Sequence, residues 1–593
     1  MEDLSRKFVA DFETTTDEND CRVWAFGICS VDDSFSFQYG NDLEVFMLWC
    51  ANPKENYSVA FHNLKFDSAF ILNWLNKNGF IRIEDKKDKA DKTYTTLISD
   101  MGAYYQIEVF FEVGKGKGKR GVNKVVFTDS MKIFNMSVER IAKDFDLPIR
   151  KGSIDYKAFR EVGHELTDEE VAYLRNDVEI VARALNTFYK QGHNKLTIGS
   201  NALASFKGLC KGFNNYFPVL DDEEDEIIRK GYRGGFTYVN PKHQGKTIKG
   251  NCVCLDVNSL YPSRLVQCVM PYGKPELFVG QYQKDQKYPL YVQRLICTFK
   301  IKKDKIPSIQ IKNSMRFIAN EYLTDSGSQP VELTLTNVDL KLFFEQYDVE
   351  VIEYLGGFKF MGVKGLFTQY VEYWTEEKKK AKQDGNKAKY AISKLFMNSL
   401  YGKFATSKTG SQKIPVFDSE GVLHYITGEP EEMKSVYLPV AVFTTAYGRY
   451  LTITTSQKVR NWTEEHLGFD GYLYSDTDSI YCKIELDQLE ELKKSAGIEI
   501  DPYKLGAWDI EQDNITRFKA LRQKCYLKEV DGKKIATVAG CPKNLSKLFN
   551  FKNFNVGFTT ANFTEDEIGK DSKLRYKQVK GGVILKETDF TIK

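Results

Sequence analysis

Acidic side chains recur along the first 190 residues at spacings that could bind divalent cations. Asp11 and Glu13 stand two residues apart in a run typical of a β-strand, so both side chains project to the same side. Asp67 follows a second strand-like run, at the start of an expected helix. Tyr173 and Asp177 are four residues apart on a further helix and share one of its faces. We expect these groups to meet at one site.

Gathered carboxylates repel one another unless cations neutralise them. Two such charges ~4 Å apart raise the energy by about 4 kcal/mol at an effective dielectric constant of about 20. Oxygen ligands suit Mg²⁺ or Mn²⁺, and two such ions could activate a water and stabilise the departing oxygen of a phosphodiester, with Tyr173 holding the water. A lone Asp-x-Glu pattern is more often a solvated surface pair, but the ordered combination within one domain favours a catalytic site.

A second set of acids lies further along the chain. Asp256 ends an apolar strand, and Asp476 and Asp478 occupy a tight turn between two expected strands. A strand end and a hairpin tip can converge, so Asp256 and Asp478 could hold two metal ions, as phosphoryl transfer to a 3′-oxygen requires. Because Asp and Ser are ordinary turn residues, the hairpin taken alone is as compatible with a plain polar turn.

A helix between these acids carries groups that suit a nucleotide. Helical spacing (i, i+4 and i+7) places three such side chains on one face: Lys394, Asn398 and Tyr401. Their ammonium, amide and aromatic ring could bind a triphosphate and a base. The alternative is an amphipathic helix whose polar face is merely solvated. Weaker signals, each commonplace alone, are the basic turn Tyr232-Arg-Gly-Gly235, the strand pair Lys524 and Tyr526, and Ser130.

The elements that would position the first acids alternate between strand and helix. Strands are expected over residues 7–12, 23–30 and 59–62, and helices over 43–50 and 69–78. A hairpin of residues 106–113 and 124–128 would enclose a flexible basic loop at 114–121. A capping box at Thr167 and Glu170 starts a long amphipathic helix that Gln191-Gly192 ends. This first unit is therefore predicted to be an α/β domain.

The remaining residues suggest a discontinuous domain. Residues 252–257 form an apolar strand, 471–483 predict strand, turn and strand, and 367–404 predict two helices joined at Asp384-Gly385-Asn386. Two segments with Pro, Gly and irregular patterns, 268–366 and 405–437, are interpreted as insertions. Strand signals return near residues 583–585.

Composition narrows the class of protein. The chain has 593 residues, with 84 Lys and Arg against 81 Asp and Glu. A net charge of +3 argues against a uniformly basic coat protein for nucleic acid but leaves room for a basic channel. The 11 cysteines include no Cys-x-x-Cys pair, which argues against a zinc site and predicts buried, reduced thiols. No apolar run approaches the roughly 18 residues of a membrane span, so a soluble cytosolic protein is expected.

Taken in order, these motifs resemble the family B DNA polymerases, and closely the protein-primed group of small Bacillus phages, the phi29 type. The resemblance runs essentially from end to end. It is carried by Asp11-Phe-Glu-Thr14, Phe61-His-Asn-Leu-Lys-Phe-Asp67, Tyr173-Leu-Arg-Asn-Asp177, Tyr232-Arg-Gly-Gly-Phe236, Asp256-Val-Asn-Ser-Leu-Tyr-Pro262, Lys394-Leu-Phe-Met-Asn-Ser-Leu-Tyr-Gly402, Asp476-Thr-Asp478, Lys524-Cys-Tyr526 and Thr591-Ile-Lys593.

The resemblance implies an α/β multidomain fold in which an RNase H-like 3′–5′ exonuclease domain precedes a right-hand polymerase with two insertions. The implied divisions are the exonuclease domain at 1–190, the palm at 191–267 and 438–538, terminal-protein region 1 at 268–366, the fingers at 367–404, terminal-protein region 2 at 405–437 and the thumb at 539–593. The first insertion would contact the priming protein. The second would wrap downstream DNA and support processivity and strand displacement.

The resemblance also implies roles for residues of the first set. Asp11, Glu13, Asp67 and Asp177 would be exonuclease metal ligands, and Tyr173 would assist them. The residues that would hold the single-stranded 3′ end are Thr14, His62, Asn63, Phe66, Ser130 and Lys143.

In the polymerase half, the resemblance implies that Asp256, Val257 and Asp478 bind metal ions, with Asp476 beside them. Tyr261 would stack under the incoming sugar and exclude a 2′-hydroxyl. The remaining substrate-binding residues would be Lys394 for the triphosphate, Tyr401 for the nascent base pair, Lys524 and Tyr526 for the primer terminus, and Asn398, Tyr232 and Gly234. Two positions depart from the family pattern: Tyr390 replaces a Lys that faces the nucleotide, and Ser475 replaces a Cys or Ala.

The sequence therefore predicts a replicative DNA-directed DNA polymerase with 3′–5′ proofreading, two Mg²⁺ ions in each centre (Mn²⁺ could substitute), protein-primed initiation and processive strand displacement. Its expected partners are template and primer DNA, dNTPs and a terminal protein. We expect a monomer, or a heterodimer with the terminal protein, in the cytoplasm of an infected bacterial host and without a membrane.

Three alternatives remain. The chain could be a family B polymerase that uses only DNA primers, a nuclease whose second half merely grips DNA, or a replication scaffold with an inactive polymerase site. The intact acids of both sets argue against the last two, because a decayed site has no reason to keep carboxylates that repel one another.

Overall fold

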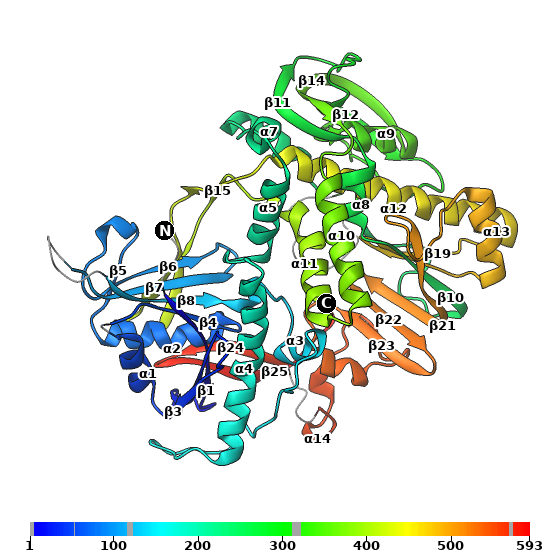
Figure 1. Ribbon diagram of the computed structural model, residues 1–593. Helices are drawn as coiled ribbons and strands as arrows, with labels where there is room; N and C mark the ends of the chain where they lie inside the picture. The colour runs from blue at the N-terminus through cyan, green and yellow to red at the C-terminus, as the bar shows by residue number, and fades with distance from the viewer. Residues whose placement is uncertain (1–4, 53, 115–121, 311–321, 569–572) are drawn as a thin grey trace.

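The computed structural model describes residues 5–52, 54–114, 122–310, 322–568 and 573–593. In Figure 1 the N-terminal unit (blue and cyan) lies on one side of helices α10 (Thr368–Gln383) and α11 (Lys387–Phe404), and a second sheet, mostly orange, lies on the other. Across the described ranges, every helix is too short or too polar to span a lipid bilayer.

The N-terminal unit is an eight-stranded sheet in the order β3-β2-β1-β4-β8-β7-β6-β5. Alternate residues of β1 divide the two faces: Phe8 and Phe12 pack among side chains of helices α1 and α2, whereas Val9 packs among side chains of α4. The bounds are β1 Arg6–Thr14, β2 Val23–Ser30, β3 Phe37–Gly40, α1 Leu43–Cys50, β4 Tyr57–Phe61, α2 Leu64–Lys77, β5 Ile81–Arg82, β6 Thr93–Ile98, β7 Tyr104–Glu112, β8 Asn123–Asp129, α3 Val138–Asp144 and α4 Asp168–Lys190.

Most expected elements of this unit are confirmed, including the capping box that starts α4. The helix predicted from residue 69 instead begins at Leu64, because Asn63 adopts a left-handed conformation (φ 85°) and turns the chain directly from β4 into α2. This early start places Asp67 in the first helical turn, close to the end of β1. The predicted loop at 114–121 lies, apart from Gly114, outside the described residues.

The second sheet has seven strands in the order β23-β22-β21-β10-β20-β19-β9, with every neighbouring pair antiparallel where the pairing is given. Helix α12, 30 residues long, packs along it and was not predicted from the sequence. Its residues are buried on most sides, so no polar stripe marks it as a helix. The bounds are β9 Thr237–Val239, β10 Ile248–Val257, α12 Leu438–Leu467, β19 Tyr472–Asp476, β20 Ser479–Cys482, α13 Leu486–Ala496, β21 Trp508–Arg522, β22 Cys525–Val530 and β23 Lys533–Val538.

The described residues of the segment 268–366 include a four-stranded sheet in the order β11-β14-β12-β13, with helix α9 beside it. Its irregular sequence pattern reflects bulges, because Gly356 and Gly357 both have positive φ on β14 and a side chain at Gly357 would collide with the Val292 carbonyl. The bounds are β11 Met270–Phe278, β12 Leu290–Ile301, β13 Val331–Thr336, α9 Asn337–Gln346 and β14 Tyr347–Val363.

Two later hairpins return to the N-terminal unit. Leu423 on β17 and Val583 on β25 are both part of the apolar core that contains Phe70 of α2. Figure 1 shows the red hairpin β24–β25 lying against the blue elements. The bounds are β15 Thr409–Gly410, β16 Lys413–Phe417, β17 Leu423–Thr427, β18 Glu431–Glu432, β24 Lys573–Val579 and β25 Gly582–Thr588.

The linking helices are mostly short. Helix α5 follows the N-terminal unit in the chain and packs beside α11. Helix α8 follows β10 directly. Their bounds are α5 Ile198–Leu209, α6 Phe213–Tyr216, α7 Asp222–Gly231, α8 Leu260–Gln267 and α14 Glu565–Ile568.

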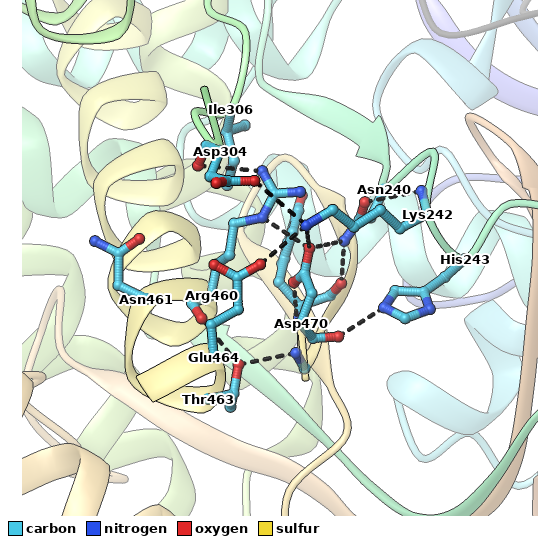
Figure 2. A network of polar contacts seen from close by, with 12 residues as sticks. Asn240, Lys242, His243, Asp304, Ile306, Arg460, Asn461, Thr463, Glu464 and Asp470 are labelled. Carbon is cyan, nitrogen blue, oxygen red and sulfur yellow. Dashed lines mark hydrogen bonds and ion pairs between the residues drawn. The ribbon is translucent and has the colours of Figure 1, made fainter. Parts of the chain in front are cut away.

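A buried polar network anchors the edge of the seven-stranded sheet to α12 (Figure 2). Arg460 Nε of α12 donates to Asp470 Oδ2 at 2.7 Å, and Asn240 Nδ2, just after β9, donates to the same oxygen at 2.9 Å. Lys242 reaches the network from the surface and pairs with Glu464 at 2.9 Å. Asp470 stands two residues before β19, so the network fixes the strand that leads to Asp476.

Replacement of Arg460 by Met should destabilise the protein strongly. Arg460 is 6% exposed and Asp470 is also 6% exposed, so the substitution removes the closer of the two cations that pair with this buried carboxylate and leaves it only the Lys242 ammonium, 3.6 Å away at the surface. We expect a loss of about 3–5 kcal/mol in the free energy of unfolding, measured by urea denaturation. Lys242→Met is the control, because that side chain is 48% exposed and should cost less than about 1 kcal/mol. Equal losses in the two variants would contradict the expectation.

Candidate active sites

The first acidic cluster consists of Asp11, Glu13, Asp67 and Asp177. Strand β1 runs parallel to β4, so the end of β1 lies beside the start of α2. Helix α4 packs on β1 and brings Asp177 to the same place. Glu13, Asp67 and Asp177 are all nearly inaccessible to solvent. The structure therefore brings together the four acids that the sequence singled out.

Burial and mutual repulsion disfavour the charged form of each acid. Burial, and next the charge of Asp177, raises the pKa of Asp11 to about 7. Burial followed by neighbouring carboxylates also raises the pKa of Glu13 and of Asp67. Within the described part of the chain, one buried oxygen of Asp67 and one of Asp177 have no hydrogen-bond partner. A group of repelling, partly unsatisfied carboxylates is the donor set that a hard divalent cation requires.

The argument that this cluster suits a metal ion comes from the chemistry of its carboxylate donors, because the side chains are not arranged as a complete set of ligands. Among the residues that the structure describes, no group of three or more Asp, Glu, His or Cys side chains could hold a metal ion as it now stands. The ammonium of Lys151 forms an ion pair with Asp177 instead. The attraction of Asp177 raises the pKa of Lys151 although burial alone would lower it.

Sequence reasoning missed two residues of this cluster. Lys151 contacts Asp177, and the hydroxyl of Tyr156 lies 2.6 Å from that of Tyr173. Both lie in the irregular segment between α3 and α4. Such a segment has no helical or strand periodicity from which the direction of a side chain could be predicted. Lys143, which the resemblance assigned to the 3′ end, is exposed in the last turn of α3.

The residues expected to hold a single-stranded 3′ end lie next to this cluster but are engaged differently. His62 Nδ1 lies 2.8 Å from Ser130 Oγ, and its Nε2 lies 2.7 Å from the Met136 carbonyl, so His62 and the buried Ser130 form a fixed wall. Asn63 and Phe66 are half-buried at the start of α2, and Thr14 is half-buried at the end of β1.

The second acidic cluster forms where β10 meets the hairpin β19–β20. Asp256 lies opposite Ser479, and the backbone N–H of Val257 donates to the Asp478 carbonyl at 2.9 Å. Thr477 adopts a left-handed conformation (φ 58°) that makes the turn between Asp476 and Asp478 tight. The strand end and the hairpin tip therefore converge, as the sequence pattern predicted.

Two further acids, missed in the sequence, complete this cluster. Asp509 on β21 lies directly opposite Asp256, and Glu511 follows two residues later. Burial, and then the charges of Asp478, Glu511 and Asp509, raises the pKa of Asp256 to about 7. Asp509 and Glu511 have the same Asp-x-Glu spacing as Asp11 and Glu13, which is the signal that could have found them.

Asp476 differs from its neighbours because it is already neutralised. Lys524 Nζ lies 2.7 Å from Asp476 Oδ1, and Thr237 Oγ1 donates to the same oxygen at 3.1 Å. Lys524 also acts to lower the pKa of Asp478, although burial leaves that pKa raised. Tyr526, on the following strand, places its hydroxyl 3.2 Å from that of Tyr481. Asp476 is thus less available to a cation than Asp256 and Asp478.

The expected nucleotide face of α11 borders the second cluster. Lys394 and Asn398 are exposed, and the charge of Lys394 acts to lower the pKa of Asp256. The rings of Tyr401 and Tyr261 lie 4.1 Å apart at 36°. The turn Tyr232-Arg-Gly-Gly235 closes this face, and Gly234 within it is exposed. A methyl group at Gly235 would lie 2.7 Å from Thr477 Cγ2 and 3.0 Å from Tyr261 Oη.

Comparison with known proteins identifies the class. Residues 51–499 match the family model described as DNA polymerase type B, organellar and viral. The polymerase of Bacillus phage M2 is 43% identical, and the match covers 100% of both chains. The structure of phi29 DNA polymerase with primer-template DNA superposes with a TM-score of 0.88, at 39% identity over 99% of this chain and 100% of that one. Its complex with incoming nucleotide substrates as well gives 0.87 at the same identity and coverage.

The fold and the matched residues are those of a family B DNA polymerase. More narrowly, the chain belongs to the phi29-like, protein-primed family B DNA polymerases of Bacillus phages. It is therefore a DNA polymerase, with the mixed α/β multidomain fold of that enzyme.

Gly235→Ala should impair DNA synthesis if the second acidic cluster carries it, because the added methyl group pushes on Thr477 between Asp476 and Asp478. Overpacking of this kind costs typically about 1–3 kcal/mol, so we expect primer extension to slow by about tenfold. The control is Gly208→Ala on α5, where no atom of the described residues lies within 4 Å of the added carbon. Steady-state nucleotide incorporation measures both variants, and equal rates would contradict the prediction.

Proposed function

We propose that this polymerase also edits, and that its two acidic clusters perform the two reactions separately. The observation that carries the proposal is the gathering of Asp11 with the buried acids Glu13, Asp67 and Asp177, two of whose oxygen atoms find no hydrogen-bond partner among the described residues. Such a group destabilises the fold unless it binds something, so its presence favours a catalytic centre. In this proposal the first acidic cluster, at the eight-stranded sheet, removes 3′-terminal nucleotides. The second cluster, at the seven-stranded sheet, adds them.

Each centre is proposed to bind two Mg²⁺ ions, which Mn²⁺ could replace. The first cluster would hold its pair through its four carboxylates, and the second through Asp256, Asp478 and the backbone of Val257. The bound ions would activate the attacking oxygen and stabilise the leaving one. Within the chain, Tyr156 holds the hydroxyl of Tyr173 in place near Asp177. The Lys151 ammonium offsets part of the negative charge of the first cluster.

The residues around the second cluster are proposed to orient nucleotide and primer. Lys394 and Asn398 would bind the triphosphate, and Tyr401 would pack against the nascent base pair. Tyr261, held against Tyr401, would lie under the sugar and exclude a 2′-hydroxyl. Lys524, Tyr526, Tyr232 and Gly234 would contact the primer and template backbone. The similarity to phi29 DNA polymerase, which is described in complex with primer-template DNA and incoming nucleotides, supports the binding of these two substrates.

We propose that the segments inferred from the sequence are functional domains of the polymerase. The insertion 268–366 would contact the terminal protein that primes synthesis, and 405–437 would enclose DNA for processive strand displacement. Membership of the protein-primed family supports the first role. The contact of β17 with the N-terminal core supports the second, because it bridges the two halves of the molecule. The enzyme would act in the cytoplasm of an infected bacterium.

Asp478→Asn should abolish nucleotide incorporation but leave the degradation of single-stranded DNA intact, because it removes one negative charge from the second cluster alone. Asp11→Ala should have the reverse effect. Primer extension and release of labelled 3′ nucleotides measure the two activities. Loss of both activities in both variants would disprove two independent centres.

Incubation with the candidate terminal protein, labelled dATP and Mg²⁺ should yield a covalent nucleotide–protein adduct. The polymerase centre would join the nucleotide to a protein hydroxyl and release pyrophosphate. The Asp478→Asn variant is the control and should give none. A wild-type enzyme that extends DNA primers but forms no adduct would favour the alternative of an ordinary DNA-primed polymerase.

A further inference from the structure

The C-terminal hairpin β24–β25 is fixed on the N-terminal unit by contacts of several kinds. Lys577 forms an ion pair with Glu18, and Glu587 pairs with Lys157 at 2.9 Å. Val583 is buried in the N-terminal core, and Gly582 lies so close to Phe70 that a side chain there would collide with its ring. The hairpin is therefore held beside α2 by several contacts that do not involve Tyr576.

Tyr576 on this hairpin lies over the start of α2. Its hydroxyl accepts a hydrogen bond from Asn63 Nδ2 at 3.0 Å. Its ring centre lies 6.0 Å from that of Phe66, with 45° between the planes, and 5.9 Å from Lys65 Nζ. The side chain remains 46% exposed, so the ring is only partly used in packing. Asn63 and Phe66 are also two of the six residues that are expected to hold the 3′ end.

We propose that Tyr576 is a DNA-binding residue of the editing site, and that its ring stacks on an unpaired base near the 3′ end. The inference rests on the proposed editing function of the first acidic cluster. Aromatic rings combined with cations form the surfaces on which proteins bind single strands without regard to sequence. Phe66, Tyr576 and Lys65 supply two rings and an ammonium at the start of the helix that carries Asp67.

The geometry distinguishes this role from simple docking. The ion pairs and Val583 hold the hairpin independently of Tyr576, and about half of the Tyr576 side chain stays exposed to solvent. The hydroxyl also orients the Asn63 amide toward the hairpin. A strand that approaches the acids past α2 would thus meet side chains from both ends of the chain. Tyr576 is then a binding residue, and its loss should weaken the binding of DNA.

The test compares Tyr576→Ala, Tyr576→Phe and Glu18→Gln with the wild-type full chain on a single-stranded oligonucleotide. Stacking contributes enough that we expect the KM for degradation to rise about tenfold in Tyr576→Ala, with a much smaller change in kcat. Tyr576→Phe keeps the ring and should lie far closer to the wild type. Glu18→Gln removes a docking contact alone and should not raise KM.

A second readout needs no catalysis. With 2-aminopurine at the 3′ end and EDTA present, stacking on the ring should quench the fluorescence in the wild type and less in Tyr576→Ala. Thermal unfolding checks that the variants fold.

Several results would overturn the proposal. An unchanged KM in a folded Tyr576→Ala enzyme would do so, and so would faster degradation, which would make the ring a cover over the site. An equal rise in KM in Glu18→Gln would reduce Tyr576 to a docking contact. A wild-type enzyme that never degrades the oligonucleotide would instead refute the editing function itself.

Discussion

Repulsion between carboxylates held away from water is the constraint on which both centres depend. Burial and neighbouring acids raise the pKa of Asp11 and of Asp256 to about 7, so each cluster is poorly stable in its ionised form without positive charge. The protein imposes this arrangement through backbone pairing: β1 lies parallel to β4, and β10 lies between β20 and β21. Strong secondary structure thus holds together groups that would otherwise separate.

The two clusters manage their charge differently. In the first, Lys151 pairs with Asp177, one of the four acids of the cluster itself. In the second, Lys524 pairs with Asp476, to one side of Asp256 and Asp478. A cation entering the first cluster therefore competes with an ammonium for the same carboxylate, whereas one entering the second meets Asp256 and Asp478, which form no ion pair with a lysine of the described residues. The two centres should consequently differ in how readily they take up metal.

Local signals predicted much of this protein. The capping box of α4, the hairpin around Asp476 and the two helices joined at 384–386 are confirmed, because each is set by a few adjacent residues. The family and the α/β multidomain fold are confirmed as well. What the sequence concealed depends on distant contacts: Lys151 sits in an irregular segment, α12 is buried on most sides, and Glu511 gains meaning only when β21 pairs with β10. The assignments of individual site residues remain predictions.

The placement of Val583 within the core of the N-terminal unit has a consequence for how the chain is made. The first 190 residues leave the ribosome long before the last strands exist, and until then the apolar side chains that receive Val583, among them Phe70, lack part of their covering. Exposed apolar surface of this kind promotes association between nascent chains. Completion of the N-terminal core therefore waits for a strand that is synthesised much later, and loss of the hairpin β24–β25 should harm solubility more than the small number of missing residues suggests.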